Sequence, residues 1–329
     1  MHQHLLVPLD GSPLAEAAIP LATELARRLH LGILLTRVHS PAVIVPSPAE
    51  MPIMMLQPEW DEGVRAETRT WLVQRAADLA RTTGLHVSPV FCIGNPAEEI
   101  ASVAARRRVR AIVCSTHGSG GLAPHWLGSV TDALVRHARC PVFALPPGAP
   151  ARSGELRTLL VLLDGSEVST AILPQAAWIA AAFQAEVELL SVVAPSSGVG
   201  RSLVGIEADE RDPLGVDAHA VETKAQLDGI AGDLRGKGIR ARSTVEVSRH
   251  PTRTILNHIS RTNPDAVALA SYGRGLSRLF LGSIADKVLR SSGRPTLLFR
   301  PRPRPAAKGG IAVLPVLETT MTGAGSGTL

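Results

Sequence analysis

The chain repeats itself once, at a distance of nearly half its length. The segment LLVPLDGSPLAEAAIPLATELA from Leu5 returns as LLVLLDGSEVSTAILPQAAWIA from Leu159, 154 residues later. The segment LGSVTDALVRHARCPVFALPP from Leu127 returns at the same offset as LGSIADKVLRSSGRPTLLFRP from Leu281. Solenoid repeats have periods of roughly 20 to 50 residues. A period of 154 residues is much longer and therefore predicts two duplicated domains. We expect them at residues 1–148 and 155–300.

Each copy alternates short apolar runs with longer helix-like segments. In the first copy, the apolar runs that predict strands are residues 4–9, 32–39, 86–92, 110–115 and 141–145. Helices are expected at residues 12–29, with Ser12 as N-cap, at 59–83, at 95–107 and after residue 128. Continuous apolar strands separated by helices are typical of a parallel sheet covered on both faces. The predicted fold class is α/β, with two doubly wound, Rossmann-like, five-stranded domains in tandem.

The charge and the aromatic content limit the partners that we expect. The net charge is +5, but the C-terminal segment holds Arg300, Arg302, Arg304 and Lys308 against Glu318, which leaves only +2 on the two copies. Aromatic residues are 3% of the chain, too few for base-stacking surfaces. We therefore expect no nucleic-acid partner. The tail, residues 301–329, alternates arginine with proline and then becomes rich in glycine, serine and threonine, so we expect disorder there.

The compartment follows from three further features. No run of 18 or more apolar residues occurs, and the first residues, MHQHLLVPLDGSP, lack the order of a secretory signal. We therefore expect no membrane partner and a cytoplasmic location. The cysteines, Cys92, Cys114 and Cys140, have no CxxC spacing, which favours reduced thiols. The histidines have no metal-ligand spacing, so we expect no metal site.

A glycine-rich loop, STHGSGGLAPHWLGSV, follows the fourth predicted strand from Ser115 to Val130. Asp10 ends the first predicted strand, and Val38 lies at the end of the second. Ligands of such sheets bind beyond the carboxyl ends of the strands, so these residues are expected to line one pocket. Glycine amides and the start of the next helix favour an anion such as phosphate. The alternative is a plain connection, in which Asp10 only caps the first helix.

At these residues the chain resembles the universal stress protein family, over nearly its whole length. The resemblance is carried by VPLDGSPLAEAA, CIGNPAEEI, STHGSGGLAPHWLGSV and RCPVFAL in the first copy, and by VLLDGSEVSTAI and SYGRGLSRLFLGSIADKVLRSSGRPTLLF in the second. The nucleotide-binding branch of the family has the pattern G-x2-G-x9-G-[ST] after the fourth strand. Gly118, Gly128 and Ser129 match it, whereas Ser115 stands where the first glycine is expected.

The resemblance implies an adenine nucleotide, ATP with or without Mg, and assigns residues to its parts. Adenosine would be held by Pro8, Leu9, Asp10 and Val38, ribose and phosphates by Ser115, His117 and Gly118, and phosphates at the helix start by Gly128, Ser129, Val130 and Thr131. The implied function is that of a cytoplasmic stress-response protein acting as a nucleotide-dependent regulator. The alternative is a non-binding tandem scaffold that acts through protein contacts. No catalytic residue and no enzymatic activity are expected, because the common nucleotide-cleaving motifs are absent from the sequence; slow ATP hydrolysis stays open.

The family's usual homodimer pairs its subunits through the fifth strand. In a tandem chain we expect PVFAL and PTLLF to form the same pairing internally, as a pseudo-dimer; a homodimer of whole chains stays open. The two pockets are expected to differ. Nine residues separate Gly118 from Gly128, but eight separate Gly273 from Gly282, and Tyr272 stands where the first copy has His117. We expect nucleotide mainly in the first copy, and the rival is a weakly competent second site.

Overall fold

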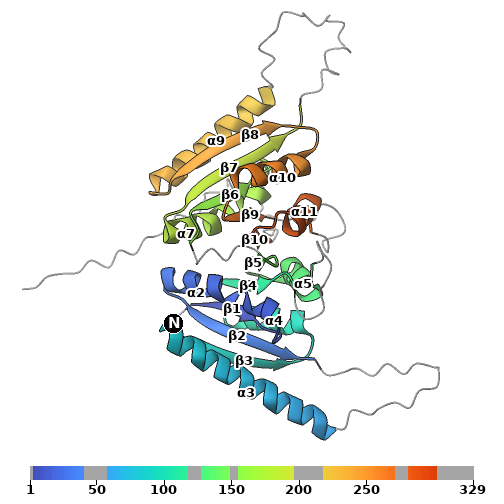
Figure 1. Ribbon diagram of the computed structural model, residues 1–329. Helices are drawn as coiled ribbons and strands as arrows, with labels where there is room; N and C mark the ends of the chain where they lie inside the picture. Colours follow the sequence, from blue (N-terminus) through green and yellow to red (C-terminus); the bar gives the residue numbers. More distant parts are fainter. Residues whose placement is uncertain are drawn as a thin grey trace, which may run out of the picture.

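The computed structural model describes residues 3–40, 58–117, 127–148, 155–195, 218–270 and 281–301. Gly118, most of the glycine-rich loop, and the predicted tail beyond Pro301 lie outside these ranges. Within them, the strands form one ten-stranded sheet in the order β3-β2-β1-β4-β5-β10-β9-β6-β7-β8 (Figure 1). The strands are β1 (His4–Pro8), β2 (Gly32–His39), β3 (Val87–Ile93), β4 (Ala111–Ser115), β5 (Val142–Leu145), β6 (Thr158–Leu162), β7 (Glu186–Val193), β8 (Ala241–Val247), β9 (Ala266–Ala270) and β10 (Thr296–Phe299).

Helices cover both faces of this sheet. They are α1 (Pro13–Glu16), α2 (Ile19–Arg28), α3 (Pro58–Thr83), α4 (Pro96–Arg106), α5 (Ser129–His137), α6 (Glu167–Thr170), α7 (Leu173–Phe183), α9 (Ala218–Gly236), α10 (Pro251–Thr262) and α11 (Ser283–Ser291). One buried apolar cluster lies under α2, α3, α7 and α9, and the other lies under α4, α5, α10 and α11. The predicted doubly wound α/β class is therefore confirmed for both copies.

The first predicted helix, residues 12–29, is wrong as a single element. The structure divides it into α1 and α2. Pro20 lies in the first turn of α2 and has no N–H to donate to the carbonyl of Glu16, so the helical hydrogen-bond ladder cannot continue through it. The predicted cap is confirmed, because the Ser12 side chain accepts a hydrogen bond from the N–H of Ala15.

The two copies meet at the predicted fifth strands. β5 pairs with β10 in antiparallel register, with Val142 opposite Leu298, Phe143 opposite Leu297 and Ala144 opposite Thr296. Every other strand pair of the sheet is parallel. The expected internal pseudo-dimer is thus confirmed as a continuous sheet, with β5 and β10 at the centre of the molecule (Figure 1).

Aromatic side chains of α7 also join the two copies. The guanidinium of Arg28, at the end of α2, lies 4.8 Å from the ring centre of Phe183, and that of Arg110 lies 4.5 Å from the ring of Trp178. Such cation–π contacts each contribute about 0.5–2 kcal/mol. The contact of Arg28 with Phe183 has no symmetric counterpart, because the matching residues 154 positions away are Ala182 and Leu29.

The strand register defines which residues of the two copies correspond. Ile33 pairs with Val87 in the first copy, and their counterparts 154 residues later, Val187 and Ala241, pair in the second. Pro96 and Pro251 begin α4 and α10 at an offset of 155, so one extra residue of the second copy lies in the turn before α10. Residues 154 apart in β1 to β3, and 155 apart in α4 and α10, are therefore equivalent.

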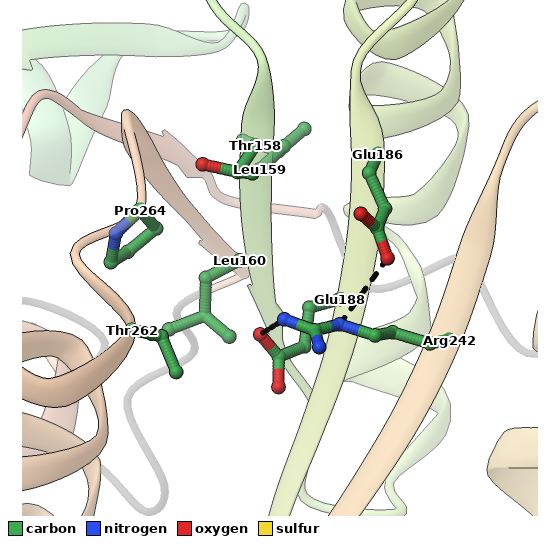
Figure 2. Close-up of a pocket in the computed structure, with 8 residues that line it drawn as sticks. All are labelled: Thr158, Leu159, Leu160, Glu186, Glu188, Arg242, Thr262 and Pro264. Atoms are coloured by element: carbon green, nitrogen blue, oxygen red, sulfur yellow. Dashed lines mark hydrogen bonds and ion pairs between the residues drawn. The ribbon is translucent and has the colours of Figure 1, made fainter.

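The second copy holds a buried charged cluster where the first copy has apolar residues. The ring of His258, in α10, is 2% exposed; its Nε2 lies 3.0 Å from Glu188 Oε1, and its Nδ1 lies 2.6 Å from Glu246 Oε1. Arg242 closes the cluster at 2.7 Å from Glu188 (Figure 2). Burial acts to raise the pKa of Glu246, but hydrogen bonds from His258 and Arg261 outweigh it and lower that pKa. The matching residues of the first copy are Leu34, Cys92 and Val103.

We predict opposite effects from breaking this cluster and from replacing it. His258→Val alone should destabilise the protein by about 3 kcal/mol, because it leaves Glu188 buried without its imidazole partner. The triple change Glu188→Leu, Glu246→Cys and His258→Val installs the first copy's apolar set, and should restore stability to wild type or above. Urea unfolding of the three proteins measures this. A triple variant no more stable than His258→Val would contradict the prediction.

Candidate functional site

Three strand ends come together at one edge of the first half of the sheet. β1 pairs in parallel with β2 on one side and with β4 on the other. Asp10 follows β1, Val38 is the next-to-last residue of β2, and Ser115 is the last residue of β4. The structure therefore brings the predicted adenosine residues and the start of the glycine-rich loop to the same carboxyl edge (Figure 1).

The turn after β1 is organised by Asp10. Its Oδ1 accepts hydrogen bonds from the N–H of Ser12 at 2.9 Å and from the hydroxyl of Ser12 at 2.6 Å. Gly11 between them has a φ of +82°, a conformation that favours glycine. Asp10 is not the cap of α1, because that position belongs to Ser12; its carboxylate instead fixes the turn that precedes the helix and the Ser12 hydroxyl that caps it.

Pro8 and Leu9 point to opposite faces of the sheet. Pro8 is half-buried and continues the face of Leu6, which packs under α4 and α5, and Val38 packs on that face too. The Leu9 side chain is buried in the other cluster, and its N–H donates to the carbonyl of Thr36 at 2.8 Å. Pro8 and Val38 can therefore offer side chains to a ligand on the α5 face, whereas the Leu9 side chain cannot.

The end of β4 is tied to the start of α5 by two hydrogen bonds. The Thr131 hydroxyl donates to the carbonyl of Ser115 at 2.7 Å, and the N–H of Gly128 donates to the carbonyl of Thr116 at 2.7 Å. A Cβ on Gly128 would lie 3.0 Å from that Thr116 oxygen, so a side chain there requires a shift. Ser115 belongs to β4, so its backbone is extended, which serine adopts without strain. Gly128 and Thr131 thus have structural roles besides any role in binding.

His117 and Cys114 are buried in this region. The ring Nδ1 of His117 lies 2.9 Å from the Thr116 hydroxyl oxygen. The backbone N–H of His117 donates to the Ser115 hydroxyl at 3.3 Å. Burial raises the pKa of the Cys114 thiol to about 12, against a smaller lowering by its contact with Thr131. The cysteine is therefore an unreactive core residue, as its apolar strand suggests.

The start of α5 is the part of this edge that can accept an anion. Gly128 is the N-cap and provides no side-chain cap, and the first N–H groups of a helix have no acceptor within the helix. Ser129 is exposed at the first position, and Val130 follows it, half-buried against the core. The helix dipole adds a partial positive charge here. Asp132 in the same turn is neutralised by Arg136 at 2.8 Å.

Sequence reasoning missed the neighbouring residue Arg37. Its guanidinium lies 5.8 Å from the ring centre of Trp71 in α3. It also lies against Gly11, where an added Cβ would be 3.0 Å from the Arg37 Nη1 atom. Burial lowers the pKa of Arg37, while the negative charge of Asp10 acts to raise it. The alternation of β2 could have placed Arg37 on the α3 face, but not beside the Asp10 turn.

The second copy repeats part of this geometry. Asp164 Oδ1 accepts from the N–H of Ser166 at 3.0 Å, and Gly282 has φ and ψ of −57° and 144°, close to the −57° and 142° of Gly128. Ala270 and Ala285 replace the hydrogen-bonded pair Ser115 and Thr131. Tyr272 and Gly273, expected to weaken the second pocket, lie outside the described ranges.

A separate pocket lies in the second copy, where β6, β7 and β8 begin, at the end of the strands away from Asp164 (Figure 2). Its polar lining includes Thr158, Thr262, Glu186, Glu188 and Arg242, and its carboxylates are already paired with Arg242. No group of side chains suited to a metal ion occurs among the residues that the structure describes. In the same part of the chain, no helix combines the length and apolar character needed to cross a membrane.

The fold defines a doubly wound α/β protein in which α5 begins at the carboxyl edge of the sheet. The sequence profile of the universal stress protein family matches residues 1–146 and 155–300, so the chain belongs to this family, with two copies of its domain in tandem.

Relatives and solved structures agree with this assignment. A universal stress protein of Mycobacterium tuberculosis is 30% identical over 311 residues, covering 91% of this chain and 97% of that protein. The universal stress protein YxiE of Bacillus subtilis is 28% identical over 145 residues, covering 43% of this chain and 97% of that protein. The crystal structure of a universal stress protein from Archaeoglobus fulgidus has a TM-score of 0.66 at 17% identity, covering 90% of this chain and 98% of that one.

We predict that the hydroxyl of Thr131 holds the start of α5 against β4. Thr131→Val removes the hydroxyl that donates to the buried Ser115 carbonyl, so it should destabilise the protein by about 1–2 kcal/mol. Thr131→Ser keeps the hydroxyl and serves as the control. Thermal unfolding compares the two, and equal stabilities would show that the bond contributes nothing.

Proposed function

We propose that the chain is a cytoplasmic stress-response protein that binds ATP, with or without Mg, in its first copy and acts as a nucleotide-dependent regulator. The observation that supports this best is the convergence, at one sheet edge, of the Asp10 turn, Pro8, Val38 and the start of α5, where Gly128 provides no side-chain cap. The exposed Ser129 hydroxyl and the first amides of α5 suit phosphate oxygens, and the apolar surface of Pro8 and Val38 suits a base.

We propose binding without catalysis. Chemistry on a phosphoryl group needs a residue that orients the attacking water, and a cation that neutralises charge. At the described part of this edge the ring of His117 contacts the Thr116 hydroxyl, and His39, the last residue of β2, is paired with Asp61 at 2.6 Å. A ligand-dependent change of conformation or partner is therefore the role we assign to the bound nucleotide.

The competing function is a scaffold that binds no nucleotide and acts through protein contacts. The engagement of Asp10, Thr131 and Gly128 in internal hydrogen bonds supports it, because each has a structural reason to be present. Mass spectrometry of small molecules released from the purified, denatured protein separates the two. Recovered ATP supports the regulator, and a protein that is empty and has no measurable affinity supports the scaffold.

We predict about one ATP per chain, held by the first copy, and Ser129→Asp tests the position. The added carboxylate is favourable at the exposed start of a helix but repels phosphates, so stability should be kept while ATP affinity falls by about tenfold or more. Ser129 is a better position than Gly128, where any side chain meets the Thr116 carbonyl.

The matched control is Ser283→Asp, the same change at the exposed start of α11. Calorimetric titration should show that Ser283→Asp binds ATP with the affinity of the wild type. Two equivalent sites in the wild type, or a loss of affinity in Ser283→Asp alone, would contradict the assignment to the first copy.

A further inference from the structure

The middle of β2 in the first copy carries a buried hydroxyl for which the described residues provide no hydrogen-bond partner. Thr36 is fully buried, and among the residues that the structure describes its Oγ1 has no hydrogen-bond partner. Buried hydroxyls are normally hydrogen-bonded, and leaving one unpaired costs about 1–3 kcal/mol. The exception therefore needs a reason.

The location of Thr36 connects it to the candidate site. In the β1–β2 ladder, Thr36 is directly opposite Pro8. It shares a face of β2 with Leu34 and Val38, because side chains alternate along a strand and both of these pack in the cluster under α4 and α5. Thr36 thus lies beside Pro8 and two residues before Val38, the two side chains on this face that we assign to adenosine.

The second copy lacks this polar group. The residue equivalent to Thr36 is Leu190, buried in the corresponding apolar cluster, and Leu162 replaces Pro8. Val192 is equivalent to Val38. The same strand position is therefore built without any buried hydroxyl in the copy that we expect to bind poorly, so the fold itself does not require one.

We propose that Thr36 is a specificity-determining residue of the first-copy pocket, whose hydroxyl forms a hydrogen bond with the nucleoside part of the bound nucleotide. This inference rests on the proposed function. The hydroxyl is covered in the structure, and half-buried Val38, two residues further along the same face, is the side chain that the ligand displaces. The phosphates are bound elsewhere, because the start of α5 is tied to β4, on the other side of β1.

Thr36→Val separates this role from a structural one, because the two effects have opposite signs. Removing an unpaired hydroxyl while keeping the side-chain shape should raise the melting temperature of the ligand-free protein by about 2 °C. It should weaken binding of both ATP and adenosine by about tenfold, the loss of one hydrogen bond. Thr36→Ser keeps the hydroxyl and should bind within about twofold of wild type.

The matched control is Thr23→Val. Thr23 lies in α2, on the other face of the sheet, and its hydroxyl is also buried and unpartnered among the described residues. This change should raise the melting temperature in the same way and leave the affinity for ATP and adenosine unchanged.

Calorimetric titration of the full chain with ATP and with adenosine gives the decision. Unchanged affinity in Thr36→Val overturns the inference, as does an equal loss in Thr23→Val. A loss for ATP without one for adenosine would place the contact at the phosphates and also overturn it. A wild-type protein that binds neither ligand overturns the proposed function, and this inference with it, before any variant is compared.

Discussion

The antiparallel pairing of β5 with β10 is the contact on which the whole arrangement depends. A single copy would expose the backbone of β5 as an open edge, next to the buried Phe143. Pairing that edge with β10 joins two five-stranded sheets into one. Helices of both copies then pack side by side on each face of the joined sheet. It also reverses the strand direction between the halves, so their carboxyl edges lie on opposite sides of the sheet.

Much of this fold follows from local patterns. Alternating apolar strands and helices determine the parallel sheet within each copy, whereas the pairing of PVFAL with PTLLF was expected from the resemblance to a family whose dimers join through the fifth strand. The break between α1 and α2 could also have been read from Pro20. The cluster around His258 could not, because it depends on Glu188 of β7, which is 70 residues from His258 in sequence.

The candidate site divides in the same way. The Asp10 turn and the glycine at the start of α5 are local features, and their place at one edge follows from strand order. Which hydroxyls are available is not local. Thr131 and Ser129 are two residues apart on one helix, yet Thr131 is bonded to Ser115 while Ser129 is exposed. The difference depends on how α5 lies against β4, which the spacing of glycines does not encode.

The cation–π contacts at α7 have a consequence for how such a chain can evolve. In a symmetric homodimer every substitution appears twice, so each contact must suit both of its copies. Here Arg28 meets Phe183, while the reciprocal positions hold Ala182 and Leu29. Covalent linkage has released the two halves from self-complementarity. One half is therefore free to accumulate changes at the carboxyl ends of its strands while the other half keeps its residues there. Duplicated genes diverge in the same way.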